Sequence, residues 1–423
     1  MMDILIRNCK VSDPLSANNG NVCDILIKDG RIAEIQIGKI DESEIKVIDA
    51  EGFEIMPGVF DFQVNCGEPG EEVKETFSSL SQSGLFGGVT GMLVMPSHKP
   101  STDNRGQLEF KKRKTENLAL DFQFAGNISI EGKGKNLAEM YDMFLGGAIA
   151  FSDNKAPADN ALLIHLAIQY SKVSGGSLIF HADESGLRMG GNVHEGEVSV
   201  QLGMKGHPAM AEEISVAKLI AIAEYNKVNI HIAGISSAGS VNLISEAKRK
   251  GIALTCSAFI PNLYFTDDDL TNFDSIYKVW PPLRSKADRA ALKNGIKSGV
   301  IDVISSDHSP ETIEFKDVEF DYAAYGMSGT QTLLQAALTV MNDMATEDLV
   351  NVLCHNPRKL LSLEPKTINK GELADFALID RGTNQLIEKS MLHSLSVNNA
   401  FVGKSLQGKI LGTYTNSQWF SRY

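Results

Sequence analysis

The chain has 423 residues, of which 43% are hydrophobic and 22% charged, and its formal net charge is −13. That is the composition of a globular protein, and the charge disfavours nucleic acid and anionic membranes as partners because it leaves no basic surface. No run of about 18 apolar residues could span a bilayer, and the start lacks the basic and apolar regions of a signal peptide. The five cysteines are scattered without a Cys-x-x-Cys pair, so we expect free thiols in a cytoplasmic protein.

Short runs with alternating apolar residues occur at both ends of the chain. Residues 3–7 (DILIR) and 24–28 (DILIK) alternate in this way, and an Asp-Gly turn then leads into RIAEIQI, which is typical of a β-hairpin. The segments KVIDAEGFEIM, ADFALID and GKILGTYTN are similar. We therefore expect residues 1–55 and 363–423 to form one small, sandwich-like β domain.

Between these ends, apolar runs alternate with stretches of helical periodicity such as MAEEISVAKLIAIAEY (210–225). Parallel strands that are covered on both faces read as nearly continuous apolar runs. Eight such runs separated by helices predict a (β/α)8 TIM barrel over residues 56–362. The runs are 58–65, 88–95, 120–128, 147–153, 177–183, 228–235, 252–259 and 301–308.

Polar and ionisable residues follow several of these runs. A polar residue at a strand end is more often a turn or cap residue than a functional one, but the carboxyl ends of barrel strands converge on one pocket. Their recurrence therefore favours a shared site. These residues are Asp61, Gln63, Asn65, Ser97, His98, Asp153, His181, Asp183, Glu184, Asp307 and His308.

A series of motifs then suggests a family. The motifs are MPGVFDF…EPG (56–70), VMP (94–96), FSD (151–153), HEGEVS…LGMKGHPAMAEE (194–213), YKVWPPLR (277–284), IDVISSDHSP (301–310) and HNPRKLL…KGELADFALID (355–380). In this order and spacing, over about residues 3–415, the chain resembles dihydroorotases of the amidohydrolase superfamily. The resemblance implies a metal-dependent barrel hydrolase that interconverts carbamoyl-aspartate and dihydroorotate in pyrimidine synthesis.

The resemblance also implies six metal-site positions, of which half are changed. A metal-bridging carboxylate, a histidine ligand and the aspartate that serves as ligand and proton shuttle are matched by Asp153, His181 and Asp307. Two histidines of the first strand and one of the sixth are replaced by Gln63, Asn65 and Gly234. His231 lies three residues earlier on its strand and would face the other side, so it cannot replace the lost ligand.

The positions implied for substrate binding are changed as well. The arginine, asparagine and histidine that contact the substrate carboxylate are replaced by Gly67, Ser97 and Glu311, and we expect Glu311 to repel a carboxylate. The asparagine before Pro-Pro-Leu-Arg is replaced by Trp280, whose indole is large enough to fill the substrate volume.

These losses affect the chemistry directly, because zinc lowers the pKa of bound water from about 15.7 to about 7. Our leading hypothesis is an inactive dihydroorotase homologue that needs no cofactor, in which Asp153, His181 and Asp307 are remnants with structural roles. Such a protein would act as a scaffold or regulatory partner. The resemblance implies aspartate carbamoyltransferase as the partner, and we expect a homodimer.

Two other hypotheses stay open. The chain could be an active hydrolase of another cyclic amide with a remodelled site that holds a single zinc ion, or it could retain residual dihydroorotase activity. Catalysis by Cys66 is disfavoured, because lone cysteines usually behave as small core hydrophobes.

If only local parts are missing, a few substitutions should restore them. Three histidines should restore the metal, and three further changes should restore the substrate contacts. The substitutions are Gln63→His, Asn65→His and Gly234→His, then Gly67→Arg, Ser97→Asn and Glu311→His, with Trp280→Asn if the indole blocks the substrate.

Overall fold

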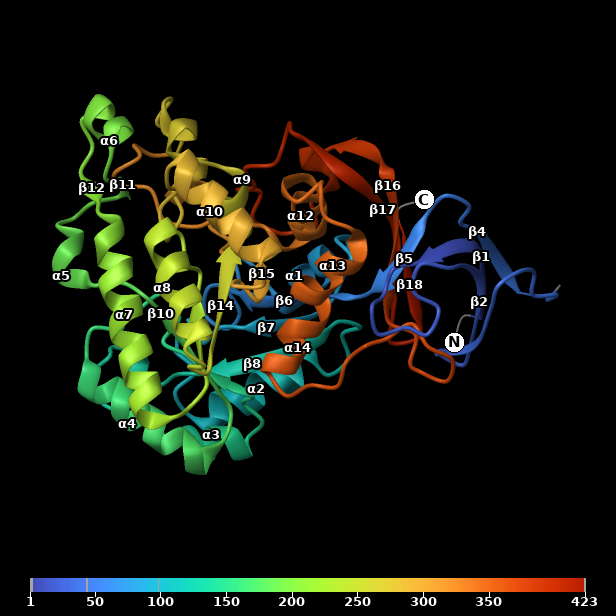
Figure 1. Ribbon diagram of the computed structural model, residues 1–423, viewed down its shortest axis with the longest axis horizontal. Helices are drawn as coiled ribbons and strands as arrows, with labels where there is room; N and C mark the ends of the chain where they lie inside the picture. Colours follow the sequence, from blue (N-terminus) through green and yellow to red (C-terminus); the bar gives the residue numbers. More distant parts are fainter. Residues whose placement is uncertain (1–2, 43–44, 98, 422–423) are drawn as a thin grey trace.

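Eight parallel strands form the wall of a nearly closed barrel in the computed structural model, which describes residues 3–42, 45–97 and 99–421. Each strand lies within one of the eight apolar runs, so the predicted (β/α)8 barrel is confirmed (Figure 1). A bridge between Val64 and His308 joins the first strand to the segment after the last. The strands are β6 (Val59–Val64), β7 (Val89–Val94), β8 (Asp121–Gly126), β9 (Ala150–Phe151), β10 (Ser177–His181), β13 (Ile230–Ala233), β14 (Leu254–Phe259) and β15 (Val303–Ser305).

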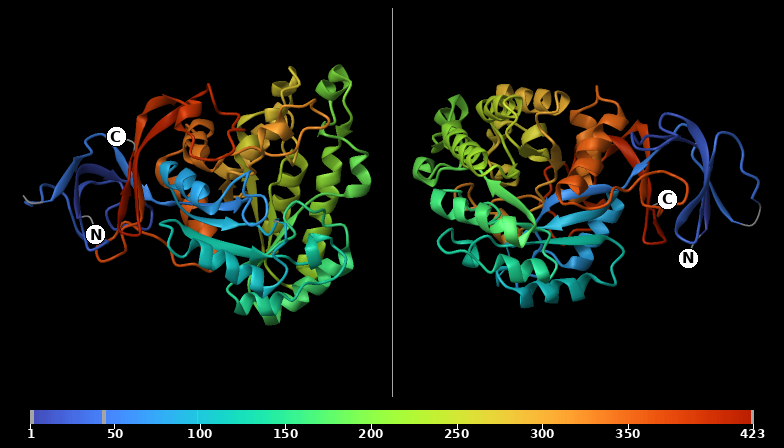
Figure 2. Two further views of the ribbon diagram at one scale, coloured as in Figure 1. Left: turned by 180° about the vertical axis from the view of Figure 1, so that it is seen from behind. Right: turned by 60° about the horizontal axis from the view of Figure 1, so that its bottom comes forward.

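Helices cover the outside of this wall, as both views of Figure 2 show. The longer ones are α1 (Phe77–Phe86), α2 (Arg105–Thr115), α4 (Ala161–Ser174), α7 (Ala209–Asn226), α8 (Ala238–Arg249), α10 (Lys286–Lys297) and α12 (Leu333–Val340). Shorter elements lie in the connections: α3 (Met140–Leu145), α5 (Ser185–Arg188), β11 (Val193–His194), α6 (Glu197–Leu202), β12 (Gly206–His207), α9 (Ile260–Tyr264), α11 (Ile313–Lys316), α13 (Thr346–Val350) and α14 (Asn356–Leu360).

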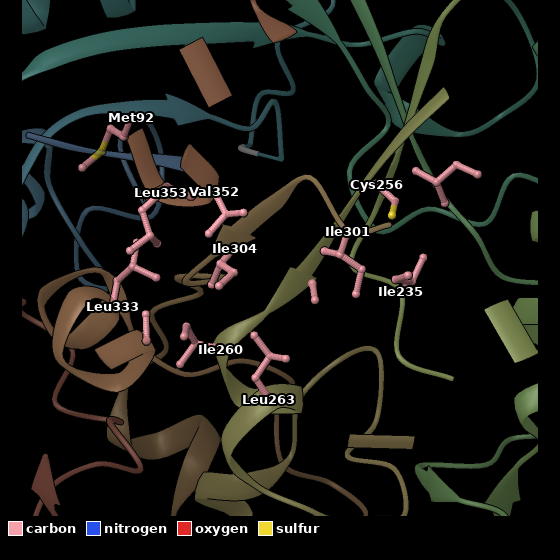
Figure 3. Close-up of a cluster of buried hydrophobic side chains, with 14 of the residues drawn as sticks. Met92, Ile235, Cys256, Ile260, Leu263, Ile301, Ile304, Leu333, Val352 and Leu353 are labelled. Atoms are coloured by element: carbon pink, nitrogen blue, oxygen red, sulfur yellow. The ribbon is translucent and has the colours of Figure 1, made fainter. Parts of the chain in front are cut away.

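The barrel strands bury apolar side chains on both faces, which explains their nearly continuous apolar sequence. Phe60 and Phe62 lie two residues apart on β6 and belong to the same buried cluster as Leu93 of β7. Met92, the neighbour of Leu93, belongs instead to the large cluster between strands and helices. Figure 3 shows Met92 in that cluster together with Ile304 of β15 and Leu333 of α12.

Both ends of the chain contribute to a second, mixed sheet beside the barrel (Figure 1). The Asp-Gly hairpin is present, with both turn residues at positive φ, the backbone that such two-residue turns require. Strand order is β18–β17–β16–β5–β1–β2–β3, and β4 pairs with β1. The strands are β1 (Ile4–Val11), β2 (Val22–Lys28), β3 (Arg31–Gln36), β4 (Lys46–Asp49), β5 (Glu54–Pro57), β16 (Phe376–Leu386), β17 (Ser405–Thr415) and β18 (Gln418–Phe420).

Strand β5 of this sheet leads through Gly58 directly into β6 of the barrel. Buried Arg358 donates to the Gly58 carbonyl at 3.0 Å, and Thr90 donates to Asp375, just before β16, at 2.6 Å. These bonds connect the barrel to the sheet at their junction. The division into domains at residues 55/56 and 362/363 stays a prediction.

Candidate functional site

The residues that the sequence predicts for the metal site lie at the carboxyl ends of five barrel strands. Gln63 lies near the end of β6 and Asn65 directly follows it, while His181 ends β10. Asp153, Gly234 and Asp307 follow β9, β13 and β15 within two residues. Because all these strands are parallel, the residues face the same end of the barrel. Their functional roles stay predictions, and His98 lies outside the described residues.

Three amide side chains form a chain of hydrogen bonds across this end. Gln63 Nε2 donates to Asn154 Oδ1 at 3.2 Å, and Asn154 Nδ2 donates to Asn65 Oδ1 at 2.8 Å. Asn154 also contacts Ser97 Oγ, and Asn65 Nδ2 donates to Ser309 Oγ at 2.9 Å. The side-chain amides of Gln63 and Asn65 therefore both bind Asn154, and Gln63 Oε1 has no hydrogen-bond partner among the described residues.

Asp153 accepts hydrogen bonds from the loop that follows β8. Its Oδ1 accepts from the backbone N–H groups of Ile128 at 3.0 Å and Ser129 at 2.9 Å, and its Oδ2 accepts from Ser129 Oγ at 2.6 Å. Burial raises the pKa of Asp153, and these hydrogen bonds partly oppose that rise. Both oxygens are thus already used, as expected of a carboxylate that holds a loop.

Asp307 is bound by a lysine that no sequence motif indicates. Lys155 Nζ lies 2.7 Å from Asp307 Oδ2, both side chains are largely buried, and the ammonium group lies 5.8 Å from the centre of the Phe259 ring. Burial raises the pKa of Asp307 to about 6, although the Lys155 charge acts to lower it. Lys155 therefore supplies the positive charge beside a carboxylate that the family resemblance assigns to a metal.

The two histidines near this site differ in their partners. His181 is buried, neither of its ring nitrogens makes a well-formed hydrogen bond to the described residues, and burial lowers its pKa to about 4. His231 is satisfied, because its ring nitrogens lie 3.0 Å from Thr255 Oγ1 and 3.1 Å from Ser257 Oγ. The prediction that His231 does not replace the lost ligand is consistent with these partners. A hydrogen bond to the Ala233 backbone partly opposes the fall in the pKa of His181, and the role of His181 stays a prediction.

Two glycine positions are closed to the side chains that the family places there. Gly234 has φ +63°, and a Cβ atom on it would lie 2.2 Å from a ring carbon of Phe259. A Cβ atom on Gly67 would lie 2.1 Å from the Glu71 carbonyl oxygen. Substitutions such as Gly234→His and Gly67→Arg would therefore require Phe259 and the surrounding backbone to move, and restoration of the site by local substitutions stays a prediction.

Trp280 is packed among polar and aromatic side chains. The Arg188 guanidinium lies 4.2 Å from the indole centre, and the rings of His207 and Tyr325 lie 4.7 and 5.4 Å from it. Arg188 also forms an ion pair with Asp183. Trp280 is therefore buried among these side chains.

We call the six implied metal-site positions the altered centre: Gln63, Asn65, Asp153, His181, Gly234 and Asp307. Signature motifs outside this centre meet in a buried ionic network. Arg284 of Pro-Pro-Leu-Arg donates to the His207 carbonyl at 2.8 Å and to Ser236 Oγ at 3.0 Å, and it lies 3.9 Å from Glu212 Oε2. His207 in turn lies 3.0 Å from Asp183 Oδ1. Burial acts to raise the pKa of Asp183, but the hydrogen bond to His207 and the nearby cations lower it overall.

Glu311 and Cys66 have local partners. Glu311 forms an ion pair with Lys74 at 3.1 Å, so the negative charge that we expected to repel a carboxylate is neutralised in place. Burial raises the pKa of the Cys66 thiol, which points to the Glu75 carbonyl at 3.7 Å. That environment suits a core residue and disfavours a thiolate nucleophile.

A catalytic zinc ion needs about three protein ligands with free lone pairs. Asp153 uses both oxygens for its loop, and Asp307 is paired with Lys155 through Oδ2. Among the described residues, the atoms here without a well-formed hydrogen bond are the ring nitrogens of His181, Asp307 Oδ1 and the neutral Gln63 Oε1, so one imidazole and one carboxylate oxygen are all that remain of the usual zinc ligand types. Over residues 3–42, 45–97 and 99–421, no three His, Cys, Asp or Glu side chains are grouped to hold a metal. The residues in place therefore do not fit zinc.

Sequence comparisons connect the chain with dihydroorotases. A family model described as dihydro-orotase-like matches residues 52–240. The protein named dihydroorotase from Syntrophus aciditrophicus is 36% identical over 417 residues, which is 97% of each chain. The dihydroorotase from Pelotomaculum thermopropionicum is 37% identical over 410 residues, or 96% of each chain.

Solved structures agree on the fold. L-hydantoinase from Arthrobacter aurescens superposes with a TM-score of 0.87 at 24% identity, covering 99% of this chain and 96% of that one. A dihydropyrimidinase from Brevibacillus agri gives a TM-score of 0.83 at 19% identity, covering 99% and 95%. Among the described helices, none is both long and apolar enough to cross a membrane.

Proposed function

The chain belongs to the dihydroorotase family, and we propose that it is a member that no longer performs the family's hydrolysis and acts as a scaffold or regulatory partner in pyrimidine biosynthesis. The observation that carries this proposal is the 2.7 Å contact between Lys155 Nζ and Asp307 Oδ2. An internal ammonium group there satisfies a carboxylate that would otherwise attract a metal cation.

An ammonium group balances charge but cannot perform the chemistry of a metal. It has no open coordination position, so it cannot bind water and lower its pKa from about 15.7 to about 7. That difference of about 9 units corresponds to roughly 12 kcal/mol in the free energy of forming the nucleophile. Asp307, which already accepts a hydrogen bond from Lys155, is far too weak a base to supply it.

The rest of the chain supports a structural role. Motifs that resemble the family's form the buried network around Arg284 and the junction around Arg358 and Asp375. These contacts stabilise the barrel whether or not the site is active. We propose aspartate carbamoyltransferase as the partner and a homodimer as the state of the chain, in the cytoplasm.

The second candidate is an active hydrolase of a cyclic amide with a remodelled, single-zinc site. Identity of 36% with a protein named dihydroorotase over 97% of the chain favours it. So do the free ring nitrogens of His181 and the Oδ1 atom of Asp307, which has no hydrogen-bond partner among the described residues. In this reading Lys155 would have to leave Asp307 before a metal could bind.

One experiment separates the two candidates. The purified chain is analysed for bound metals and assayed with dihydroorotate and with carbamoyl-aspartate, before and after addition of zinc. We expect no stoichiometric zinc and no turnover above that of the Asp307→Asn variant, which controls for contaminating enzyme. Zinc-dependent turnover that the Asp307→Asn variant lacks would establish the second candidate instead.

The proposed partner is tested separately. We expect the chain to co-sediment with aspartate carbamoyltransferase from the same organism and to change its sedimentation coefficient. Independent sedimentation of the two proteins at micromolar concentrations would contradict this partner without bearing on turnover.

A further inference from the structure

An open groove lies beside the barrel between two segments far apart in the sequence. It has a volume of about 940 Å³ and is lined mainly by residues 311–317 and 395–398, with Val73 and residues 274–276 at its edges. The two long segments are in direct contact, because Glu311 N donates to Ser396 Oγ at 3.0 Å. The groove is therefore formed by segments that contact each other in the folded chain.

The walls of this groove expose an unusual amount of apolar surface. Val73, Ile313, Phe315 and Leu395 each leave more than half of their surface open to solvent. Single exposed apolar residues are common on soluble proteins, but four around one concave surface are typical of a binding site. Burial of these side chains against a partner would remove them from water.

The same surface is acidic. Residues 311–321 contain five carboxylates and one ammonium group. Lys316, which carries that ammonium group, is buried and donates to the carbonyls of Ala324 and Gly326 at 3.0 Å. Glu314 and Asp317 are exposed and have no ion-pair partner within the described part of the chain. Lys389 also lines the groove, and Glu311 is paired with Lys74. Carboxylates still outnumber ammonium groups along the rim, with Glu314 and Asp317 unpaired among the described residues, around an apolar floor.

This charge limits what can bind. Nucleic acid and anionic lipid would be repelled. A second copy related by a two-fold axis would place the acidic segment against itself, which is also unfavourable. A polypeptide with apolar side chains between basic ones satisfies both the floor and the rim of the groove.

We propose that this groove docks a segment of another protein in which apolar side chains are flanked by lysine or arginine. The proposal deepens the scaffold role proposed above and rests on it. The apolar contacts would supply most of the affinity, and the acidic rim would accelerate association and select against acidic segments.

The test uses the full chain and two synthetic peptides of about 15 residues, roughly four helical turns. Both have leucines at helical spacing, and their other positions are lysine in one peptide and glutamate in the other. Binding is measured by fluorescence anisotropy. We expect the lysine peptide to bind and the glutamate peptide to bind at least about tenfold more weakly, equivalent to about 1.4 kcal/mol.

Two double variants remove the features of the groove. Ile313→Ser/Phe315→Ser removes apolar floor and Glu314→Lys/Asp317→Lys reverses the rim charge, and each should weaken binding of the lysine peptide at least about tenfold. All four side chains are exposed, so the fold should tolerate both variants.

Matched controls make the same kinds of change on the distant helical face of the barrel. Leu162→Ser/Leu166→Ser alters two exposed leucines of α4, and Glu139→Lys/Glu224→Lys reverses two exposed carboxylates there. These variants should leave the affinity within about twofold, since their side chains are remote from the proposed contact.

A benzophenone at the centre of the lysine peptide locates the site, and its crosslinks should fall in residues 311–318 or 395–402. Crosslinks on the α4 face, equal losses in the control variants, or groove variants that change only the self-association of the chain would each overturn the proposal. Peptide binding by a chain that also turns over dihydroorotate would refute the proposed inactivity alone. If the chain shows no turnover and does not bind the lysine peptide specifically, the docking site alone would be refuted.

Discussion

Two buried polar regions of the barrel differ in how their charges are balanced. Around Arg284, buried polar groups contact one another, such as His207 and Asp183 at 3.0 Å. Around Asp307, neutral amides occupy ligand positions and Lys155 provides the cation. The first region pairs its polar groups with one another, whereas the second pairs Asp307 with an ammonium group and has amides at two positions that the family resemblance assigns to metal ligands.

The largest effect should come from the Arg284 region. Arg284→Met should lower the free energy of unfolding by about 3–5 kcal/mol, because removing the guanidinium group leaves the buried Glu212 charge without its neighbouring cation. Urea denaturation of the variant measures this loss. Arg249→Met, at the exposed end of α8, is the control and should change stability little; equal losses in both variants would contradict the distinction between the two regions.

A smaller loss should follow when Lys155 is removed. Lys155→Met leaves Asp307 without its partner and should cost roughly 1–3 kcal/mol, since the carboxyl group can take up a proton when it is unpaired. Lys155→Met/Asp307→Asn should recover much of this loss, and a double-mutant cycle measures the coupling. Additive losses would show that the two groups do not stabilise each other.

The pH dependence of stability should distinguish two groups within the altered centre, Asp307 and His181. Burial raises the pKa of Asp307 to about 6 and lowers that of His181 to about 4. Between about pH 4 and 6 the folded chain keeps a proton on Asp307 that the unfolded chain releases, so stability falls as pH rises. The unfolded chain binds a proton at His181 that the folded chain excludes, so that contribution rises with pH. Each slope is at most about 1.4 kcal/mol per pH unit.

These opposing slopes can be separated by substitution. Asp307→Asn should make stability rise more steeply with pH over this window, and His181→Asn should remove the rising contribution. Denaturation midpoints at several pH values measure both. Parallel profiles for the parent chain and the two variants would contradict the assigned pKa values.

The smallest effect is expected from partial reconstruction of the metal site. Gln63→His/Asn65→His should bind only sub-stoichiometric zinc, because Lys155 still holds Asp307 and Asp153 still holds its loop. Adding Lys155→Ala should increase zinc uptake by freeing one carboxylate. Elemental analysis after dialysis distinguishes the two variants, and stoichiometric zinc in the first would mean that Lys155 does not protect Asp307.

The barrel could be predicted because its strands are marked by apolar runs, such as residues 88–95 around β7. The altered centre was only partly predictable. Lys155 lies in no recognised motif, and its partner Asp307 is 152 residues away, so nothing local indicates the pair. Likewise, the contact that closes Gly234 comes from Phe259 on the neighbouring strand, and only the folded barrel brings the two together.

The sheet built from both chain ends has a consequence for biosynthesis. Strand β5 pairs with β16, so that Pro57 faces Phe376, and Asp13 near the start accepts a hydrogen bond from His355 at 2.8 Å. During translation the backbone edge of β5 stays unpaired until almost the whole chain has left the ribosome. Unpaired strand edges promote aggregation, so the nascent chain is exposed to misassembly until its last strands dock, and a chain truncated before β16 would keep that open edge permanently.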